Sequence, residues 1–122
     1  MENKIIAFDL DDVLCYRTSE KGRVEKYLSC KPIPTMINIV NKCYDKGRTI
    51  IIYTARGFTS FEKDIHDIYA NLFTITQNQL TAWGVKYHKL VFGKIHYDVL
   101  IDDKAVNSLE IHDVEGIEKW LK

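Results

Sequence analysis

The sequence predicts an α/β protein built on a parallel sheet, and three observations lead to this prediction. Short apolar runs rich in β-branched residues recur along the chain, as in strands buried on both faces of a sheet. Segments with helical periodicity separate these runs. The chain has 122 residues, 46% of them hydrophobic and 28% charged, which suits one globular core. We therefore expect a single domain over residues 1–122: a three-layer, Rossmann-like parallel sheet with helices on both faces.

Four strands are expected, and polar residues follow each of them. The strands are Lys4–Phe8, Thr49–Tyr53, Tyr87–Phe92 and Asp98–Ile101. Their carboxyl ends should meet at one edge of the sheet, where open α/β sheets place their functional sites.

Three helices are expected around these strands, namely Pro34–Lys46, Ser60–Trp83 and Val114–Lys122. Proline suits the first turn of the first helix, and Ser60 is a candidate N-cap of the second. The polar stretch Asn71–Gln79 could break the second helix. The last helix would place Ile117, Trp120 and Leu121 against the sheet. The polar segment Leu10–Pro32 fits neither pattern and could be a loop or a small hairpin above the strand ends.

Composition excludes several classes of protein. Lys and Arg number 17, and so do Asp and Glu, whereas a dedicated nucleic-acid binder has a strong basic excess. No apolar run approaches the 18 residues or so of a membrane span, and no signal-peptide core follows the N-terminus. The three cysteines form no C-x-x-C pair, so neither a disulfide framework nor a zinc site is expected. The prediction is a cytoplasmic protein without membrane insertion.

Acidic residues gather after the first and last predicted strands. Asp9, Asp11 and Asp12 follow the first, and Asp102 and Asp103 follow the last. Carboxylates gathered this closely repel one another unless a cation or a proton intervenes. Oxygen ligands without nearby Cys or His suit Mg²⁺, which often serves to hold a phosphate.

The other two strand ends carry groups that bind phosphate. Thr54 supplies a hydroxyl and Lys94 an ammonium group. Lys86 and Lys89 compete with Lys94 for this role, because they lie close by in the sequence.

The order of these residues along the chain resembles the order of the motifs in the haloacid dehalogenase superfamily of phosphohydrolases. Its four strand-end motifs are matched in order by Asp9-Leu10-Asp11-Asp12-Val13, Thr54, Lys94 and Asp102-Asp103. The resemblance covers residues 5–103 and implies that superfamily's fold.

The resemblance implies a phosphatase that works in two steps. Asp9 would be the nucleophile and form an aspartyl-phosphate, and Asp11 would be the general acid and base. Thr54 and Lys94 would bind the phosphoryl oxygens. The implied cofactor is Mg²⁺, and its ligands would come from Asp9, Asp11, Asp102 and Asp103.

Several local strings are similar to those of small capsule-biosynthesis phosphatases within this superfamily. These strings are Pro32-x-Pro34, Thr54-Ala55-Arg56, Trp83-x-Val85-x-Tyr87, Gly93-Lys94 and Ile101–Ala105. Ile95 departs from the proline usual in these relatives. The similarity implies a small phosphorylated metabolite, a sugar or polyol precursor of a surface polysaccharide, as substrate. Arg56 could clamp that substrate or only pair with an acid.

Two readings of another class compete with a phosphatase. A signalling receiver domain also joins acids to a Thr and a Lys, but its phosphate-accepting Asp ends a mid-chain strand, where this chain has Tyr53-Thr54. An inactive binding domain on the same scaffold is the second alternative.

The intervals between the motifs leave no room for a cap domain. About 40 residues separate Asp11 from Thr54, and about 40 more separate Thr54 from Lys94, and each interval is taken up by a helix and a loop. The site should therefore be open, covered by a large substrate or by a second subunit. Tyr16, Tyr27 and Leu28 are candidates for the covering surface of a homo-oligomer.

Overall fold

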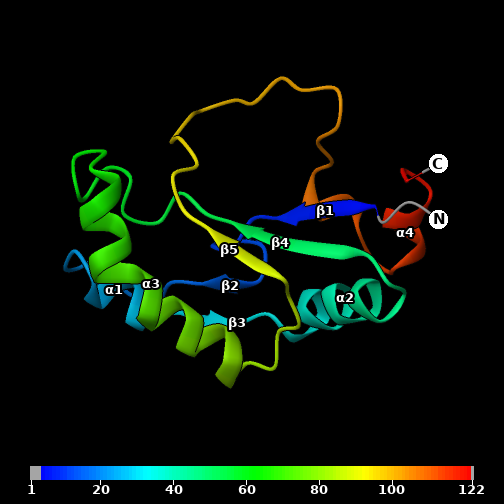
Figure 1. The fold of residues 1–122 in the computed structure, drawn as a ribbon, viewed down its shortest axis with the longest axis horizontal. Helices are drawn as coiled ribbons and strands as arrows, with labels where there is room; N and C mark the ends of the chain where they lie inside the picture. Colours follow the sequence, from blue (N-terminus) through cyan, green and yellow to red (C-terminus); the bar gives the residue numbers. More distant parts are fainter. Residues whose placement is uncertain (1–3, 122) are drawn as a thin grey trace.

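The structure is a computed structural model that describes residues 4–121, and its centre is a three-stranded parallel sheet (Figure 1). The strands are β1 (Ile5–Phe8), β4 (Thr49–Tyr53) and β5 (Lys89–Val91), in the order β1-β4-β5. Phe8 pairs with Ile52, and Ile52 pairs with Leu90. The predictions of an α/β fold and of the first three strands are confirmed.

Helices α2 (Pro34–Asp45) and α3 (Ile65–Ala82) connect these strands and lie on the same side of the sheet (Figure 1). Right-handed crossovers require this arrangement, because the strand order advances in one direction. Ile50 and Ile52 face this side and are fully buried. On the opposite face of β1, Ile5 is 64% exposed and Ala7 is exposed too. The expected second helical layer therefore does not cover this part of the sheet.

Helix α3 is continuous, so the polar stretch 71–79 does not break it. Four of its residues recur at every fourth position and are buried, which gives the helix one packed stripe: Ile68, Leu72, Thr76 and Leu80. Its N-cap is Asp64, whose carboxylate accepts a hydrogen bond from the backbone N–H of Asp67. The prediction of Ser60 as the N-cap is wrong, because residues 58–63 form turns before the helix begins.

The segment between β1 and α2 forms a small hairpin-like unit, one of the two forms expected. It contains β2 (Cys15–Tyr16), the one-turn helix α1 (Glu25–Leu28) and β3 (Lys31–Pro32). Strands β2 and β3 pair antiparallel. Tyr27 is 4% exposed, and its hydroxyl accepts a hydrogen bond from the backbone N–H of Gly57. Tyr27 therefore belongs to the core and not to an exposed covering surface.

The predicted strand Asp98–Ile101 is wrong, because these residues form no strand in the structure. They lie in a wide loop that leaves the sheet after β5, drawn in yellow and orange in Figure 1. Gly93 has φ +95°, a left-handed conformation, and lies where this loop leaves the sheet. Val99 and Ile101 are 75% and 94% exposed. Without a partner strand, an apolar run of this length cannot form a ladder.

The last expected helix is reduced to one turn, α4 (Glu115–Glu118), preceded by the 3-10 turn η1 (Ser108–Glu110). Ile117 is buried as expected, but Trp120 is 62% exposed and does not pack against the sheet. Lys122, the end of the expected helix, lies outside the described residues. Among residues 4–121, no helix is long and apolar enough to cross a bilayer.

Candidate active site

A hollow of about 470 Å³ opens beside the carboxyl ends of the strands. Its charged lining residues carry both signs in equal number: Asp9, Asp11, Asp12, Arg17, Glu20, Lys26, Arg56 and Lys94. Three segments supply its walls: the turn after β1 together with the β2–α1 region, the turn after β4, and the loop after β5. Parallel strands bring these segments to one edge of the sheet, as the sequence predicts.

Asp9 and Lys94 form an ion pair in this hollow. The Lys94 ammonium lies 3.2 Å from Oδ2 of Asp9, and the side chains are 15% and 40% exposed. Oδ1 of Asp9 accepts a hydrogen bond of 2.8 Å from the backbone N–H of Leu10. One carboxylate oxygen is thus held by the backbone and the other by a cation, so the group is oriented while it still reaches solvent.

The environment of Lys94 keeps its ammonium group charged. Partial burial lowers its pKa, but the Asp9 carboxylate and the Tyr97 hydroxyl raise it by more, so the pKa lies above the ordinary value of 10.5. The ammonium also lies within 6 Å of the ring centroids of Tyr53 and Tyr97, at 5.8 and 5.6 Å. A fixed positive charge at this point suits an anionic ligand.

The structure places the two competing lysines away from this hollow. Lys86 precedes β5, at the opposite end of the strand, and pairs with Asp45 at 2.9 Å. Lys89 is exposed at the first position of β5. Of the three candidates, Lys94 is the one that contacts Asp9.

Asp11 is turned toward Arg56. Nε and Nη2 of Arg56 donate to the two carboxylate oxygens of Asp11 at 3.0 and 3.1 Å, a bidentate pair. The side chain of Arg56 is fully buried, whereas that of Asp11 is 19% exposed. The carboxylate of Asp11 is therefore held on the inner wall of the hollow.

The remaining N–H groups of Arg56 are also occupied. Nη1 donates to the Thr76 hydroxyl at 3.0 Å and to the Gln79 side-chain oxygen at 2.6 Å, both on α3. Burial lowers the pKa of the guanidinium, but Asp11 raises it by more. In this arrangement Arg56 pairs with an acid, the second of its two expected roles, and holds Asp11 in position.

Thr54 does not line the hollow, although the next residue, Ala55, does. Its side chain is buried, and the hydroxyl oxygen accepts a hydrogen bond of 3.1 Å from the backbone N–H of Arg56. Its backbone oxygen accepts from the backbone N–H of Lys94 at 3.3 Å. Thr54 thus connects the turn after β4 to the residue that contacts Asp9, and its predicted contact with phosphate stays a prediction.

Asp102 and Asp103 do not join the other acids. Both are exposed in the wide loop, and neither lines the hollow. The carboxylate of Asp102 accepts a hydrogen bond from the backbone N–H of Lys104 at 2.9 Å, and this bond keeps the pKa of Asp102 below its ordinary value. The predicted grouping of these acids with Asp9 and Asp11 is absent from this conformation.

The donors suited to a metal ion fall into two different sets. Within residues 4–121, the one group of three acid or thiol side chains close enough to share an ion is Asp11, Cys15 and Cys30. Thiols are soft ligands and do not indicate Mg²⁺. The carboxylates of Asp9 and Asp12 also line the hollow, and Mg²⁺ commonly takes only one or two carboxylates and keeps several waters. Among the described residues, these two carboxylates form no cluster of three with a further acid, so their arrangement alone does not indicate Mg²⁺.

The two thiols beside Asp11 affect each other. The hydrogen bond from Cys15 lowers the pKa of Cys30, with Arg56 acting in the same direction. The same bond and burial raise the pKa of Cys15. The sequence alone indicates no role for either cysteine, since their spacing matches no metal or redox motif. Only the pairing of β2 with β3 brings them together.

Comparison with known proteins shows the fold alone. No protein-family model matches the chain, and no curated protein matches it either. A structural-genomics target from Vibrio cholerae, described without a function, has a similar structure. It is 25% identical in sequence, the match covers 97% of this chain and 96% of that one, and the TM-score is 0.81. The chain is therefore similar over nearly its whole length to one other small α/β protein.

Proposed function

We propose that this protein is a phosphomonoester hydrolase in which Asp9 is the nucleophile. The ion pair between Asp9 and Lys94 carries this proposal. A carboxylate oriented by the backbone can attack phosphorus only if the negative charges of the phosphate are neutralised nearby. The Lys94 ammonium, 3.2 Å from Asp9, supplies such a charge in a hollow large enough for a small phosphate ester.

In the proposed reaction, an oxygen of Asp9 forms a bond to phosphorus while the bond from phosphorus to the leaving oxygen breaks. The product is an aspartyl-phosphate on Asp9 and a free alcohol. Water then attacks the phosphorus, which releases inorganic phosphate and restores the carboxylate. Lys94 balances the charge on the phosphoryl oxygens in both steps.

Asp11 is the proposed proton donor to the leaving alcohol and the acceptor of a proton from the attacking water. Its carboxylate faces Arg56 in this structure, so a side-chain rotation away from the guanidinium must precede proton transfer. Arg56 is a positioning residue in this scheme: it holds Asp11 at the wall of the hollow.

Mg²⁺ is the proposed cofactor, and the carboxylates of Asp9 and Asp11, which line the hollow, are two of its four proposed ligands, with Asp102 and Asp103 as the others. When bound, it would supply further positive charge to the phosphate oxygens. Lys26 adds positive charge to the lining, whereas Arg17 is paired there with Glu20 at 3.4 Å. A small, polar, anionic molecule such as a phosphorylated sugar or polyol suits this lining, and the resemblance to capsule-biosynthesis phosphatases favours the same class.

Asp102 enters this scheme through a rearrangement of the wide loop. β1 pairs with β4 on one side and with no strand among the described residues on the other. Parallel pairing of residues 98–101 with this free edge would satisfy backbone N–H and C=O groups that the edge of β1 leaves unpaired. With Ile101 beside Phe8, Asp102 would lie beside Asp9. The superfamily's full set of acids would then be assembled.

The test is phosphate release from a panel of phosphorylated sugars and polyols in the presence of Mg²⁺. We expect activity that EDTA abolishes and that Mg²⁺ restores. Asp9→Asn should leave less than about a thousandth of the wild-type turnover, because it removes the nucleophile. Asp45→Asn is the matched control, since Asp45 is an exposed acid paired with Lys86 outside the hollow, and it should keep full activity. Turnover by Asp9→Asn near the wild-type rate would refute the assignment.

A further inference from the structure

Two cysteine thiols meet beside Arg56 inside the protein. The sulfur atoms of Cys15 and Cys30 and a carboxylate oxygen of Asp11 lie within 4.8 Å of one another. Nη2 of Arg56 contacts the two sulfurs at 3.6 and 3.4 Å. Each sulfur also lies 3.5 Å from Oδ1 of Asp11. No step of the proposed hydrolysis uses either thiol.

The fold holds these thiols together across a short antiparallel ladder. Cys15 in β2 pairs with Pro32 in β3, and Cys30 lies just before β3. The two cysteines are therefore diagonal neighbours across the two strands, and diagonal side chains lie within reach of each other. Cys43, the third cysteine, is buried in α2 and does not take part in this cluster.

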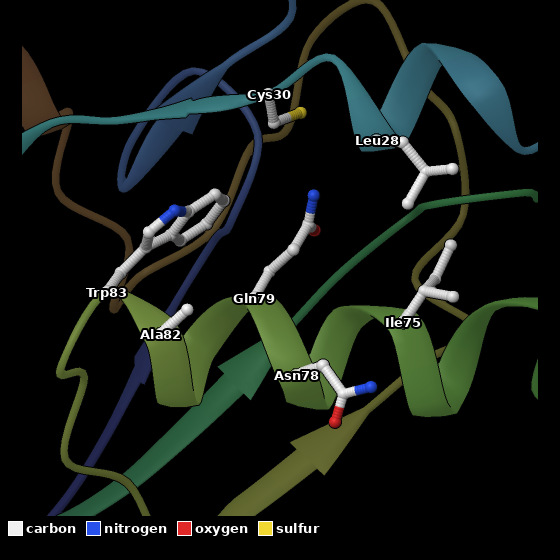
Figure 2. A pocket seen from close by; sticks show the side chains of 7 residues that line it. All are labelled: Leu28, Cys30, Ile75, Asn78, Gln79, Ala82 and Trp83. Atoms are coloured by element: carbon white, nitrogen blue, oxygen red, sulfur yellow. The ribbon is translucent and has the colours of Figure 1, made fainter.

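A second hollow gives access to one of the two sulfurs. It has a volume of about 340 Å³ and lies between α1 and the second half of α3, with a largely apolar lining that includes Leu28, Ile75 and Trp83. Figure 2 shows the sulfur of Cys30 facing this space above the amide of Gln79. Cys30 is 9% exposed and Cys15 is fully buried. A small reagent thus meets Cys30 first.

We propose that Cys15 and Cys30 are a redox-active pair, a modification site at which a peroxide closes an intramolecular disulfide. Disulfides in cytosolic proteins are typically transient or regulatory. The pair combines the two features expected of such a site: one thiol accessible from a hollow, and a second thiol placed beside it to resolve the first product.

The reaction balances in two steps. The sulfur of Cys30 attacks one peroxide oxygen: an S–O bond forms, the O–O bond breaks, and one molecule of water leaves with the thiol proton. The sulfur of Cys15 then attacks the sulfenic acid of Cys30. An S–S bond forms, the S–O bond breaks, and a second water leaves with the proton of Cys15. The thiol pair loses two electrons, which reduce the peroxide to water.

Disulfide formation would change the surroundings of Asp11. The bond shortens the distance between the two sulfurs to about 2.05 Å, so at least one of them must move relative to Arg56 and Asp11. It also removes the two S–H groups beside the Asp11 carboxylate. The consequence is a local rearrangement at the inner wall of the hollow that holds Asp9 and Lys94.

The test is thiol mapping of the folded, reduced chain after treatment with a small excess of hydrogen peroxide. Free thiols are alkylated, and the chain is cleaved with trypsin, which separates the three cysteines because Lys and Arg residues lie between them. We expect one cross-linked product that joins the Cys15 and Cys30 peptides, with Cys43 alkylated. Dithiothreitol should restore all three free thiols.

Cys43→Ala is the control variant and should give the same cross-link. Cys15→Ala should give no cross-link and leave Cys30 as a sulfenic acid, which a dimedone probe detects by its added mass. Because the wild-type map alone decides the matter, the proposal remains testable if a variant does not fold. It is overturned if Cys15 and Cys30 stay alkylatable after peroxide treatment, or if the cross-links formed involve Cys43 or join two chains.

Discussion

Burial of the Arg56 guanidinium costs a large part of its hydration free energy, and its partners offset that cost. Asp11 supplies the opposite charge, while Thr76 and Gln79 accept the remaining N–H groups. These contacts connect the turn after β1, the turn after β4 and helix α3. A single buried side chain thus holds together the segments that form the inner wall of the hollow.

Replacement of Arg56 by methionine should destabilise the fold strongly. The variant leaves Asp11 partly buried without its partner, and loss of one member of a buried pair costs about 3–5 kcal/mol. Lys86→Met is the matched control, because the pair of Lys86 with Asp45 is exposed and worth about 0–1 kcal/mol. Urea unfolding measures both values. An Arg56→Met variant as stable as the Lys86→Met variant would contradict this role.

For the hollow, the sequence predicts which residues lie there better than it predicts which side chains contact one another. Asp9 and Lys94 could be selected because each follows an apolar run and parallel strands end at one edge. The inward turn of Arg56 could not be predicted, since its partners lie 20 to 45 positions away in the chain. The same holds for Cys15 and Cys30, which meet only through the ladder between β2 and β3.

Helix α4 is a single turn of four residues, and an ion pair anchors it. Nε and Nη2 of Arg48 donate hydrogen bonds to the two carboxylate oxygens of Glu118, at 3.0 and 2.6 Å. Arg48 lies directly before β4, so this pair attaches the C-terminal helix to the start of the central strand. Its hydrogen bonds to Arg48 hold the pKa of Glu118 below the ordinary value of 4.5.

This lowered pKa makes the contribution of the pair depend on pH. A carboxylate with a lowered pKa in the folded state stabilises the protein above its unfolded pKa, and this stability is lost as pH falls through the folded value. Glu118→Gln should therefore be less stable than wild type at pH 7. The difference should shrink once pH falls below 4.5.

Glu115→Gln is the control on the same helix, because Glu115 pairs with Lys46 at 3.8 Å and is well exposed. It should change stability little at any pH. Thermal unfolding between pH 7 and pH 3 measures both variants. A difference between wild type and Glu118→Gln that stays constant over this range would show that the pair is not the anchor.

The elements that the sequence predicts well are those with strong local patterns. Continuous apolar runs fixed the positions of β1, β4 and β5, and a helical stripe fixed α2 and α3. The run 98–101 has a similar pattern but forms no strand here, because a strand gains stability only from a partner. Residue pattern alone therefore indicates which segments can pair and not whether they do.

The edge of β1 that pairs with no described strand could accept the exposed apolar run 98–101 as a further strand of the sheet. Ile5 at the edge strand and Val99, Leu100 and Ile101 in the loop are exposed. Edge strands with unpaired N–H and C=O groups accept further strands readily. A closed form with a fourth strand would extend the sheet beyond β1 and bring Asp102 to Asp9.

Hydrogen exchange measures this closure directly. Addition of Mg²⁺ together with inorganic phosphate should slow the exchange of backbone amides in residues 98–101, because pairing with β1 protects them. Amides in the middle of α3 serve as the internal control and should exchange at the same rate with and without these additions. Unchanged exchange in 98–101 at saturating phosphate and Mg²⁺ would refute the proposed closure.

In the proposed reaction Asp9 becomes phosphorylated, and a single-turnover measurement can detect this phosphorylation. Asp11→Asn removes the group proposed to activate water, whereas p-nitrophenyl phosphate has a leaving group that needs no proton donor. When the Asp11→Asn variant is mixed with p-nitrophenyl phosphate and Mg²⁺, about one nitrophenolate should be released per chain. Peptide mass spectrometry after an acid quench should find the phosphoryl group on Asp9. A burst of the same size in the variant that also carries Asp9→Asn, or a phosphoryl group on another residue, would show that Asp9 is not the nucleophile.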